Sequence, residues 1–253
     1  MNSITISLCV AAVVFAGGLV GLQAHRWLPD HHLTKETQEV VRLGTGMLSV
    51  LASLVLGLLI ATAKTSYDTT DKAIRSYAAE LALLNETLRD YGGPAAAPRD
   101  LLRSYTQRLL ANGWPTDGSR SAVLEDEGSR TLLEHVREAI RGLKPVDEGQ
   151  RWLQASAIDI NLGLLRQRWQ LIEQQGPNVQ GAVLGILAGW ITLIFASFAL
   201  NAPRNATVVA AFLVCALSIG GAIFLILEMD RPLDGVLQIS SWPMQNALAT
   251  MNW

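Results

Sequence analysis

Four long stretches without a single charged side chain dominate this sequence of 253 residues. Residues 4–22, 44–63, 179–200 and 206–227 contain no Asp, Glu, Lys or Arg. Each stretch approaches the roughly 20 residues that an α-helix needs to cross a hydrocarbon core of about 30 Å. A segment inside a bilayer must satisfy its backbone hydrogen bonds internally, and an isolated apolar segment does so only as a helix. We therefore predict four transmembrane helices and an all-α fold.

The overall composition supports a membrane protein with the lipid bilayer as its first partner. Hydrophobic residues make up 50% of the chain and the mean hydropathy is +0.27. Charged residues make up 17%, whereas soluble proteins average about 25%. The net charge of −2 leaves no basic stripe, so nucleic acid is not an expected partner. Cys9 and Cys215 both lie within apolar stretches, which indicates small hydrophobic residues rather than a disulfide or a metal pair.

The first apolar stretch has an alternative interpretation as a cleaved signal peptide. Signal peptides begin with positive charge and end in a small-residue cleavage site. Residues 1–3 contain no Lys or Arg, and the stretch is followed by Gln23-Ala24-His25-Arg26-Trp27. We therefore expect a retained span.

Four spans divide the chain into a series of segments. We expect two transmembrane helices with their connecting loop over 1–63, a helical domain over 64–178, two more transmembrane helices over 179–229, and a C-terminal tail over 230–253. Both termini and the middle domain then share one side of the membrane. Near the spans this side carries six basic residues (Lys64, Lys72, Arg75, Arg166, Arg168 and Arg231), against four on the other side (Arg26, Lys35, Arg42 and Arg204). The excess predicts that the middle domain and the termini are cytoplasmic, in an inner-membrane protein.

The middle domain is predicted to be helical throughout, because Gly and Pro collect at a few breaks between periodic segments. Its first helix follows the second span without a breaker and repeats apolar residues every three or four positions, at Ile74, Tyr77, Leu81, Leu84, Leu88 and Tyr91. Its last helix repeats the spacing at Ile158, Leu162, Leu165, Trp169 and Ile172. Two shorter helices are expected near 98–111 and 120–142. The chain contains no GxSxG, P-loop, GxGxxG or HExxH motif, so we do not expect an enzyme.

Small residues mark two kinds of helix surface within the spans. Gly17 and Gly21 form a GxxxG pair on the first span, and Gly181, Gly185 and Gly189 form a tandem pair on the third. Such ridges let helix backbones approach closely in lipid, so we expect them to be packing surfaces.

The second span places small or hydroxyl residues at every fourth position, at Thr45, Ser49, Ser53 and Gly57. We call these four residues the hydroxyl stripe. It is either a packing surface or the wet lining of a pore, which Leu54 and Leu58 would narrow; hydrophobic constrictions of this kind gate channels by dewetting.

Three carboxylates lie at the C-terminal end of the fourth span. Glu228, Asp230 and Asp234 are costly at a membrane boundary unless they are wet or paired. Arg231 is available for a structural ion pair. Alternatively, the three carboxylates and nearby carbonyls supply the oxygen ligands that calcium prefers, although their spacing matches no EF-hand loop. Calcium is the only cofactor that the sequence suggests.

Several segments resemble the bestrophin-like family of uncharacterised bacterial membrane proteins. The resemblance rests on LGLLIATAKTSYD at 56–68, on the segment from APRNATVV to VLQISS at 202–241, and on YGG and LLRSYTQRL between them. It implies the arrangement of bestrophins proper, which are pentameric anion channels with four spans per subunit, a helical cytoplasmic domain and a pore lined by the second span. Their calcium clasp follows a Pro-Phe-Gly segment, to which Pro232-Leu233-Asp234-Gly235 is similar in position. The dense acidic run of the clasp and the phenylalanines of the bestrophin pore neck are missing here.

The sequence therefore predicts a homo-oligomeric, channel-like pathway for inorganic ions, with the second span as the pore helix. The alternative is a non-conducting membrane scaffold or sensor that acts through its helical cytoplasmic domain.

Overall fold

The computed structural model describes residues 2–24, 29, 34–115, 126–173, 181–200 and 202–252. Within these residues every regular element is a helix, which confirms the all-α prediction. The elements are α1 (Ser3–Ala24), α2 (Lys35–Tyr91), a 3₁₀ turn (Gly93–Ala95), α3 (Ala96–Gly113), α4 (Glu127–Arg141), α5 (Glu148–Glu173), α6 (Gly181–Leu200), α7 (Ala206–Met229) and α8 (Trp242–Thr250). Helices α1, α2, α6 and α7 are each long and apolar enough to span a membrane, as the sequence predicts.

The chain folds as two compact units. The membrane unit contains Met1–Ser66 and Pro177–Asp230, and the extramembrane unit contains Tyr67–Gly176 and Arg231–Trp253. Residues 230–253 were expected to form a separate C-terminal tail, and Arg231–Trp253 belong to the same compact unit as the middle of the chain.

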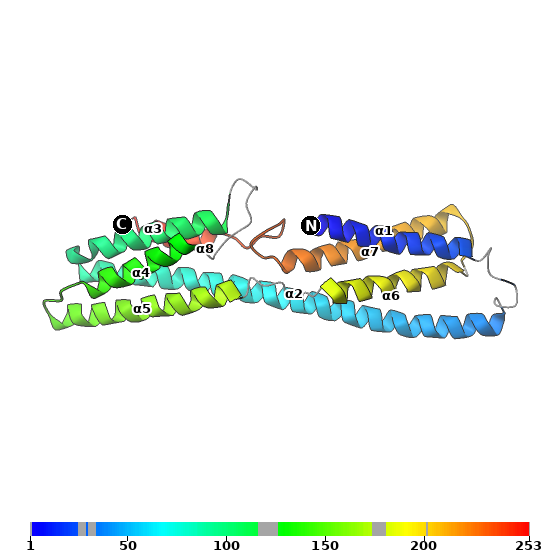
Figure 1. Ribbon diagram of the computed structural model, residues 1–253, viewed down its shortest axis with the longest axis horizontal. Helices are drawn as coiled ribbons and strands as arrows, with labels where there is room; N and C mark the ends of the chain where they lie inside the picture. Colours follow the sequence, from blue (N-terminus) through cyan, green and yellow to red (C-terminus); the bar gives the residue numbers. More distant parts are fainter. Residues whose placement is uncertain are drawn as a thin grey trace. The chain divides into compact units, whose positions relative to one another are not determined.

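Helix α2 belongs to both units because nothing interrupts it (Figure 1). It is 57 residues long, and from Leu58 to its end at Tyr91 it contains neither Gly nor Pro. It ends at Gly92, whose φ of 100° suits glycine, and Gly93-Pro94 follows. The predicted continuation of the second span into the middle domain is therefore confirmed.

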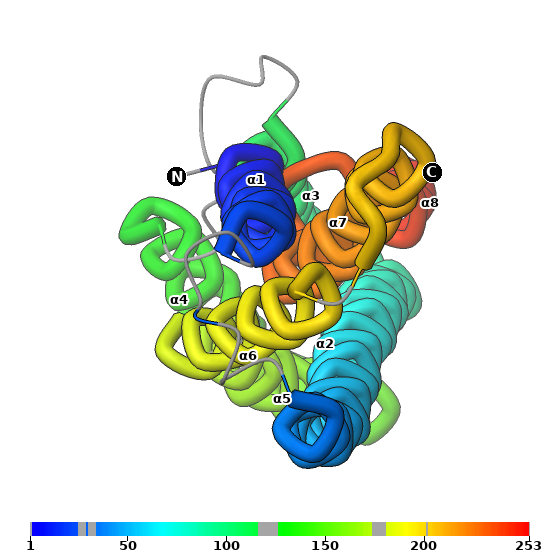
Figure 2. Tube along the Cα trace, turned by 90° about the vertical axis from the view of Figure 1, so that its right-hand side faces the viewer, coloured from blue at the N-terminus to red at the C-terminus, as the bar shows by residue number. Residues whose placement is uncertain are grey.

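In the membrane unit α1 packs closely against both α6 and α7 (Figures 1 and 2). Its buried positions include Ser7, Ala11, Val14, Gly18 and Gly21, which are mostly small. The N-terminal apolar segment is thus an integral helix of this unit. Asn205 begins α7 by accepting a hydrogen bond from the backbone N–H of Val208 at 2.8 Å.

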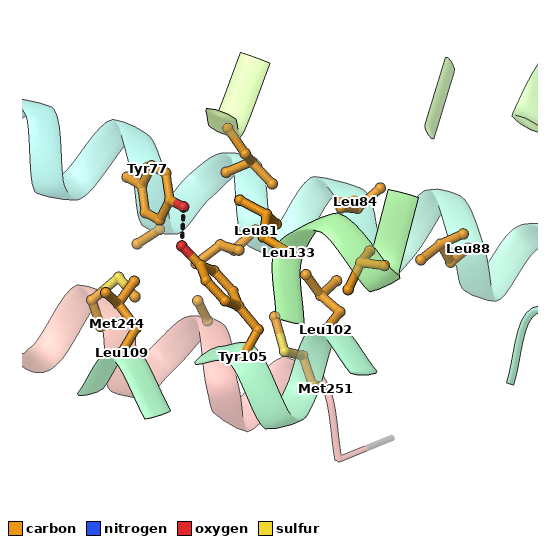
Figure 3. Close-up of a cluster of buried hydrophobic side chains, with 14 of the residues drawn as sticks. Tyr77, Leu81, Leu84, Leu88, Leu102, Tyr105, Leu109, Leu133, Met244 and Met251 are labelled. Carbon is orange, nitrogen blue, oxygen red and sulfur yellow. Dashed lines mark hydrogen bonds between the residues drawn. The ribbon is translucent and has the colours of Figure 1, made fainter. Parts of the chain in front are cut away.

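The core of the extramembrane unit is built on the predicted apolar face of α2. All six of its predicted residues are buried and belong to one hydrophobic cluster. Figure 3 shows Leu81, Leu84 and Leu88 of α2 beside Leu102 of α3 and Leu133 of α4.

The face of α5 that the apolar repeat predicts to be buried differs by one position from the face that is buried. Its most buried residues are Ala157, Asn161, Leu164, Arg168 and Leu171, and Trp169 is 57% exposed. The buried face contains an amide and a guanidinium, so the hydrophobic pattern favoured the neighbouring, more apolar face. Ile158, Leu165 and Ile172 on that face are partly buried at the edge of the core.

Helix α8 was not expected from the sequence. It has only nine residues, too few to establish a hydrophobic period, and Pro243 lies in its first turn. Met244, Ala247 and Met251, at the C-terminal end of the chain, join the extramembrane core (Figure 3). Two hydrogen bonds hold this segment: Trp114 Nε1 donates to the carbonyl of Ile239 at 2.7 Å, and Asn85 Nδ2 donates to the carbonyl of Thr250 at 3.2 Å.

Candidate functional site

The membrane segment of α2 has one packed face and one open face. Thr45, Ala52 and Ala63 are buried against the rest of the membrane unit. Leu54 and Leu58, in contrast, are 70% and 66% exposed within the chain. Only 11% of the most apolar stretch of α2 is buried, compared with 33% for α6. The open face of α2 is therefore available to lipid, to water or to another copy of the chain.

The hydroxyl stripe crosses from the packed face to the open face. Thr45 is buried, Ser49 is half-buried, and Ser53 and Gly57 are exposed. The physical reason is helical geometry: a repeat of four residues exceeds one turn of 3.6 residues, so each step rotates by about 40° around the helix. The structure brings Ser53, Gly57, Leu54 and Leu58 together on the open face, and it places Thr45 on the packed face.

The serine hydroxyls of the stripe donate hydrogen bonds to backbone carbonyls of their own helix. Ser49 Oγ donates to the carbonyl of Thr45 at 2.7 Å, and Ser53 Oγ donates to the carbonyl of Ser49 at 2.8 Å. This bond to residue i−4 lets a hydroxyl lie in an apolar environment without an unpaired donor. The oxygen of Ser53 keeps a lone pair that water or a hydrated ion can approach from the open face.

The two predicted glycine ridges have different surroundings. A Cβ at Gly21 would lie 2.8 Å from the Cα of Ala196, and one at Gly17 would lie 3.1 Å from the carbonyl oxygen of Thr192, both on α6. Around Gly181, Gly185 and Gly189 nothing lies within 4 Å of such a Cβ. The first ridge is a contact between α1 and α6, and the second lies on a face of α6 that the described residues leave open.

Sequence reasoning missed a further close contact. A Cβ at Gly220 of α7 would lie 2.9 Å from the Cβ of Ala11 on α1. Gly220 is followed by Gly221 and has no partner glycine four residues away, so no GxxxG pattern draws attention to it. The spacing of Ala216 and Gly220, two small residues four positions apart, is the sequence signal that could have found it.

The carboxylates at the end of α7 are largely shielded from solvent. Glu228 and Asp230 are buried, Asp234 is half-buried, and all three take part in interactions. Over the described ranges, no three His, Cys, Asp or Glu side chains gather closely enough to hold a metal ion. Calcium binding by these carboxylates and nearby carbonyls stays a prediction, and the function proposed below does not depend on it.

A polar cluster that the sequence did not predict lies within the extramembrane core. The hydroxyls of Tyr77 and Tyr105 point toward each other and share a hydrogen bond (Figure 3). Burial raises the pKa of Tyr77 well above its ordinary value, and the neighbouring Tyr105 adds to this increase. Burial also raises the pKa of Tyr105, so both phenols stay protonated at neutral pH. Arg168 lines the same small apolar cavity as the two rings.

Asp126 organises the beginning of α4. Its carboxylate accepts hydrogen bonds from Arg108, from Asn112 Nδ2 at 3.2 Å, and from the backbone N–H of Ser129 at 3.1 Å. The Arg108 guanidinium is the main reason that the pKa of Asp126 falls to about 2.

Comparison with known proteins gives this arrangement a family. The sequence matches the Bestrophin-like domain over residues 10–244, which is most of the chain. None of the curated proteins matches it. Among solved structures, it is similar to a variant of a bacterial bestrophin homologue from Klebsiella pneumoniae in which a tryptophan is replaced by alanine. The TM-score is 0.70 at 14% identity, over 100% of this chain and 99% of that one.

A second solved structure agrees in fold. It is a membrane protein variant with a glycine replaced by alanine, and it matches with a TM-score of 0.68 at 13% identity over 96% of both chains. Sequence identities this low establish only the similarity in fold, whereas the match to the family model covers the chain almost from end to end. The protein belongs to the bestrophin-like family and has the four-span helical fold of a bacterial bestrophin homologue.

Proposed function

We propose that this protein forms a homo-oligomeric pathway for inorganic ions, lined by the open face of α2. The observation that carries the proposal is this open face, where Ser53 and Gly57 lie next to Leu54 and Leu58. Small and hydroxyl residues leave room for water, and leucines narrow a path. Membership of the bestrophin-like family and the fold of a bestrophin homologue support an ion pathway in particular.

The open ridge of α6 supports an oligomer. In lipid, helices associate through close backbone contact at small residues, and α1 and α6 already use this device within the chain. Gly181, Gly185 and Gly189 offer the same kind of surface with nothing against it. We assign this ridge to the contact between neighbouring protomers; the resemblance to bestrophins suggests five of them.

The oligomer contact is tested by enlarging one glycine of the ridge. Gly185→Leu should lower the oligomer mass measured by native mass spectrometry in detergent. Gly221→Leu on α7 is the matched control, since that position also has open space around it but lies outside the ridge. Equal oligomers from both variants would remove the ridge from the interface.

Thiol accessibility tests the pathway directly. Cys9 and Cys215 are first replaced by alanine, because both are exposed in the chain and would be labelled. A cysteine at Ser53 should then react with a water-soluble thiol reagent, since reaction requires a thiolate in contact with water. A cysteine at Ala52, one position away on the packed face, should not react.

Conductance in planar bilayers completes this test. Purified protein should conduct above the level of empty bilayers, and Ser53→Trp should block the current because it adds bulk at the constriction. Ala52→Cys should conduct like the parent. An unreactive Ser53→Cys together with no conductance would reject the pathway and favour the alternative, a non-conducting scaffold or sensor that acts through its extramembrane unit.

We also propose that the protein lies in the bacterial inner membrane with its extramembrane unit and both termini in the cytoplasm. The excess of basic residues on that side supports this orientation. Alkaline phosphatase, which is active only in the periplasm, should be inactive when fused after Gly113 and active when fused after Pro29. The opposite pattern would reverse the orientation.

A further inference from the structure

The extramembrane unit contains a groove between two of its helices. It has a volume of about 490 Å³ and is bounded by side chains of α4 and of the C-terminal half of α5. These two helices lie side by side (Figure 1). Pockets that bind small molecules have volumes of roughly 300–1,000 Å³, so the groove is large enough for one. We call it the arginine groove, because Arg130, Arg137 and Arg168 line it.

Arg137 is the residue that points to a ligand. Its Nε is buried, and it makes no hydrogen bond with any described residue. None of the interactions found in the described part of the chain involves its side chain. A buried cationic donor without an acceptor costs free energy, because it has lost its water and gained nothing in return. Among the described residues, none supplies an acceptor to the buried Nε of Arg137.

Three acidic residues, Asp126, Glu127 and Glu134, also line the groove, and none of them accepts a hydrogen bond from Arg137 Nε. The carboxylate of Asp126 already accepts from Arg108, Asn112 and Ser129, and its low pKa keeps it ionised for them. Glu134 accepts from Arg130 Nε at 3.2 Å on the exposed side of α4. Arg168 donates from Nη2 to the backbone carbonyl of Asp126 at 3.2 Å, which positions a second guanidinium in the lining.

The opposite wall of the groove is apolar. Leu165, Trp169 and Ile172 of α5 line it, and Trp169 is 57% exposed although it continues an apolar repeat. An exposed indole beside guanidinium groups suits a flat organic group, while the guanidinium forks suit a carboxylate or phosphate.

We propose that the arginine groove binds a small organic anion that joins a carboxylate or phosphate monoester to a flat apolar group. The anionic group pairs with Arg137, and the flat group lies against Trp169. This site is independent of the ion pathway, and its occupancy can be measured without any conductance.

Isothermal titration calorimetry of the full-length protein in detergent tests the site, with phenyl phosphate and benzoate as probes. At least one probe should bind saturably, and Arg137→Gln should weaken that binding tenfold or more. Arg141→Gln is the matched control, since it removes the same charge from an exposed position of α4 outside the groove. Trp169→Leu should weaken the binding of the aromatic probe, while inorganic phosphate alone should bind more weakly than phenyl phosphate.

Several outcomes would overturn the proposal. They are the absence of saturable binding, equal losses in Arg137→Gln and Arg141→Gln, and inorganic phosphate that binds as tightly as phenyl phosphate. Arg137→Gln is expected to fold with an unchanged or raised melting temperature, because the buried Nε that it removes has no hydrogen-bond partner among the described residues. If it fails to fold, Arg137→Lys keeps the charge but loses the planar fork, and the same tenfold weakening is expected.

Discussion

The two units of this chain solve opposite packing problems. In the membrane unit glycines let helices approach closely, as at Gly21 against Ala196 and Gly220 against Ala11, while Leu54 and Leu58 are exposed. In the extramembrane unit Leu81 and Leu84 are completely buried. Lipid is as apolar as leucine, so burying leucine in the membrane gains little and close contact of small residues drives association. Water outside the membrane drives large apolar side chains inward.

The two units also differ in the hydrogen-bond partners of their polar side chains. Hydroxyls in the membrane unit, such as Ser49 and Ser53, bond to the backbone of their own helix. Hydroxyls of the extramembrane unit, such as Thr106, do the same, but this unit also makes polar contacts between helices, including Tyr77 with Tyr105 and Arg99 with Asn85 at 3.1 Å. These contacts between helices help to specify the tertiary structure of the extramembrane unit, whereas Ser49 and Ser53 are satisfied before their helix packs.

The largest expected effect is the difference in stability between two leucine substitutions, one in each unit. Leu84→Ala should lower the free energy of unfolding by about 2–5 kcal/mol, because it leaves a cavity in the extramembrane core (Figure 3). Leu54→Ala on the open face of α2 should cost less than about 1 kcal/mol, as its side chain is not packed within the chain. Thermal and denaturant unfolding in detergent compare the two. Similar losses would mean that Leu54 is buried in the assembled protein.

A smaller effect is expected from the glycines of the membrane unit. Gly21→Val should cost about 1–3 kcal/mol, because the added carbons meet the backbone of α6, which cannot rotate away. Gly221→Val, which meets open space, should cost clearly less. The measurement is the melting temperature of the detergent-purified variants. If both variants melt alike, the backbone contact between α1 and α6 is not what stabilises this unit.

Substitution of Asp126 in the extramembrane unit should have a still smaller effect on the free energy of unfolding, and this effect should depend on pH. Asp126→Ala should cost about 1 kcal/mol near neutral pH, since it removes the N-cap of α4 and the partner of Arg108. The pKa of Asp126 is lowered from 3.8 to about 2 in the folded chain, so its contribution is present above the unfolded value and is lost as the pH falls toward 2. The stability difference from the parent should therefore close between these two values. A difference that stays constant down to pH 2 would mean that the charge of Asp126 is not involved.

Calcium is expected to give the smallest effect. Because Glu228, Asp230 and Asp234 do not gather closely enough among the described residues to hold a metal ion, millimolar calcium should raise the melting temperature by at most about 2 °C, the shift that roughly 1 kcal/mol or less gives in a chain of this size. Glu228→Gln should abolish any rise. A rise of many degrees, lost in Glu228→Gln, would mean that a second protomer completes the site.

Much of the fold follows from the sequence by itself. The four spans follow because backbone groups in lipid leave no choice but helix, and the apolar face of α2 from Ile74 to Tyr91 follows because its period continues without a breaker. The identity of the family could also be predicted, since its characteristic segments survive along most of the chain.

Tertiary structure decided which of several equivalent surfaces is used. The sequence contains two glycine ridges that look alike, and only the packing of α1 against α6 distinguishes the occupied ridge from the open one. Likewise, α5 buries the face that contains Asn161 and Arg168 instead of its more apolar neighbouring face, and the groove beside Arg137 exists only because α4 and α5 meet. The physical reason is that local periodicity fixes which residues share a face of a helix, whereas the neighbour that covers the face comes from elsewhere in the chain.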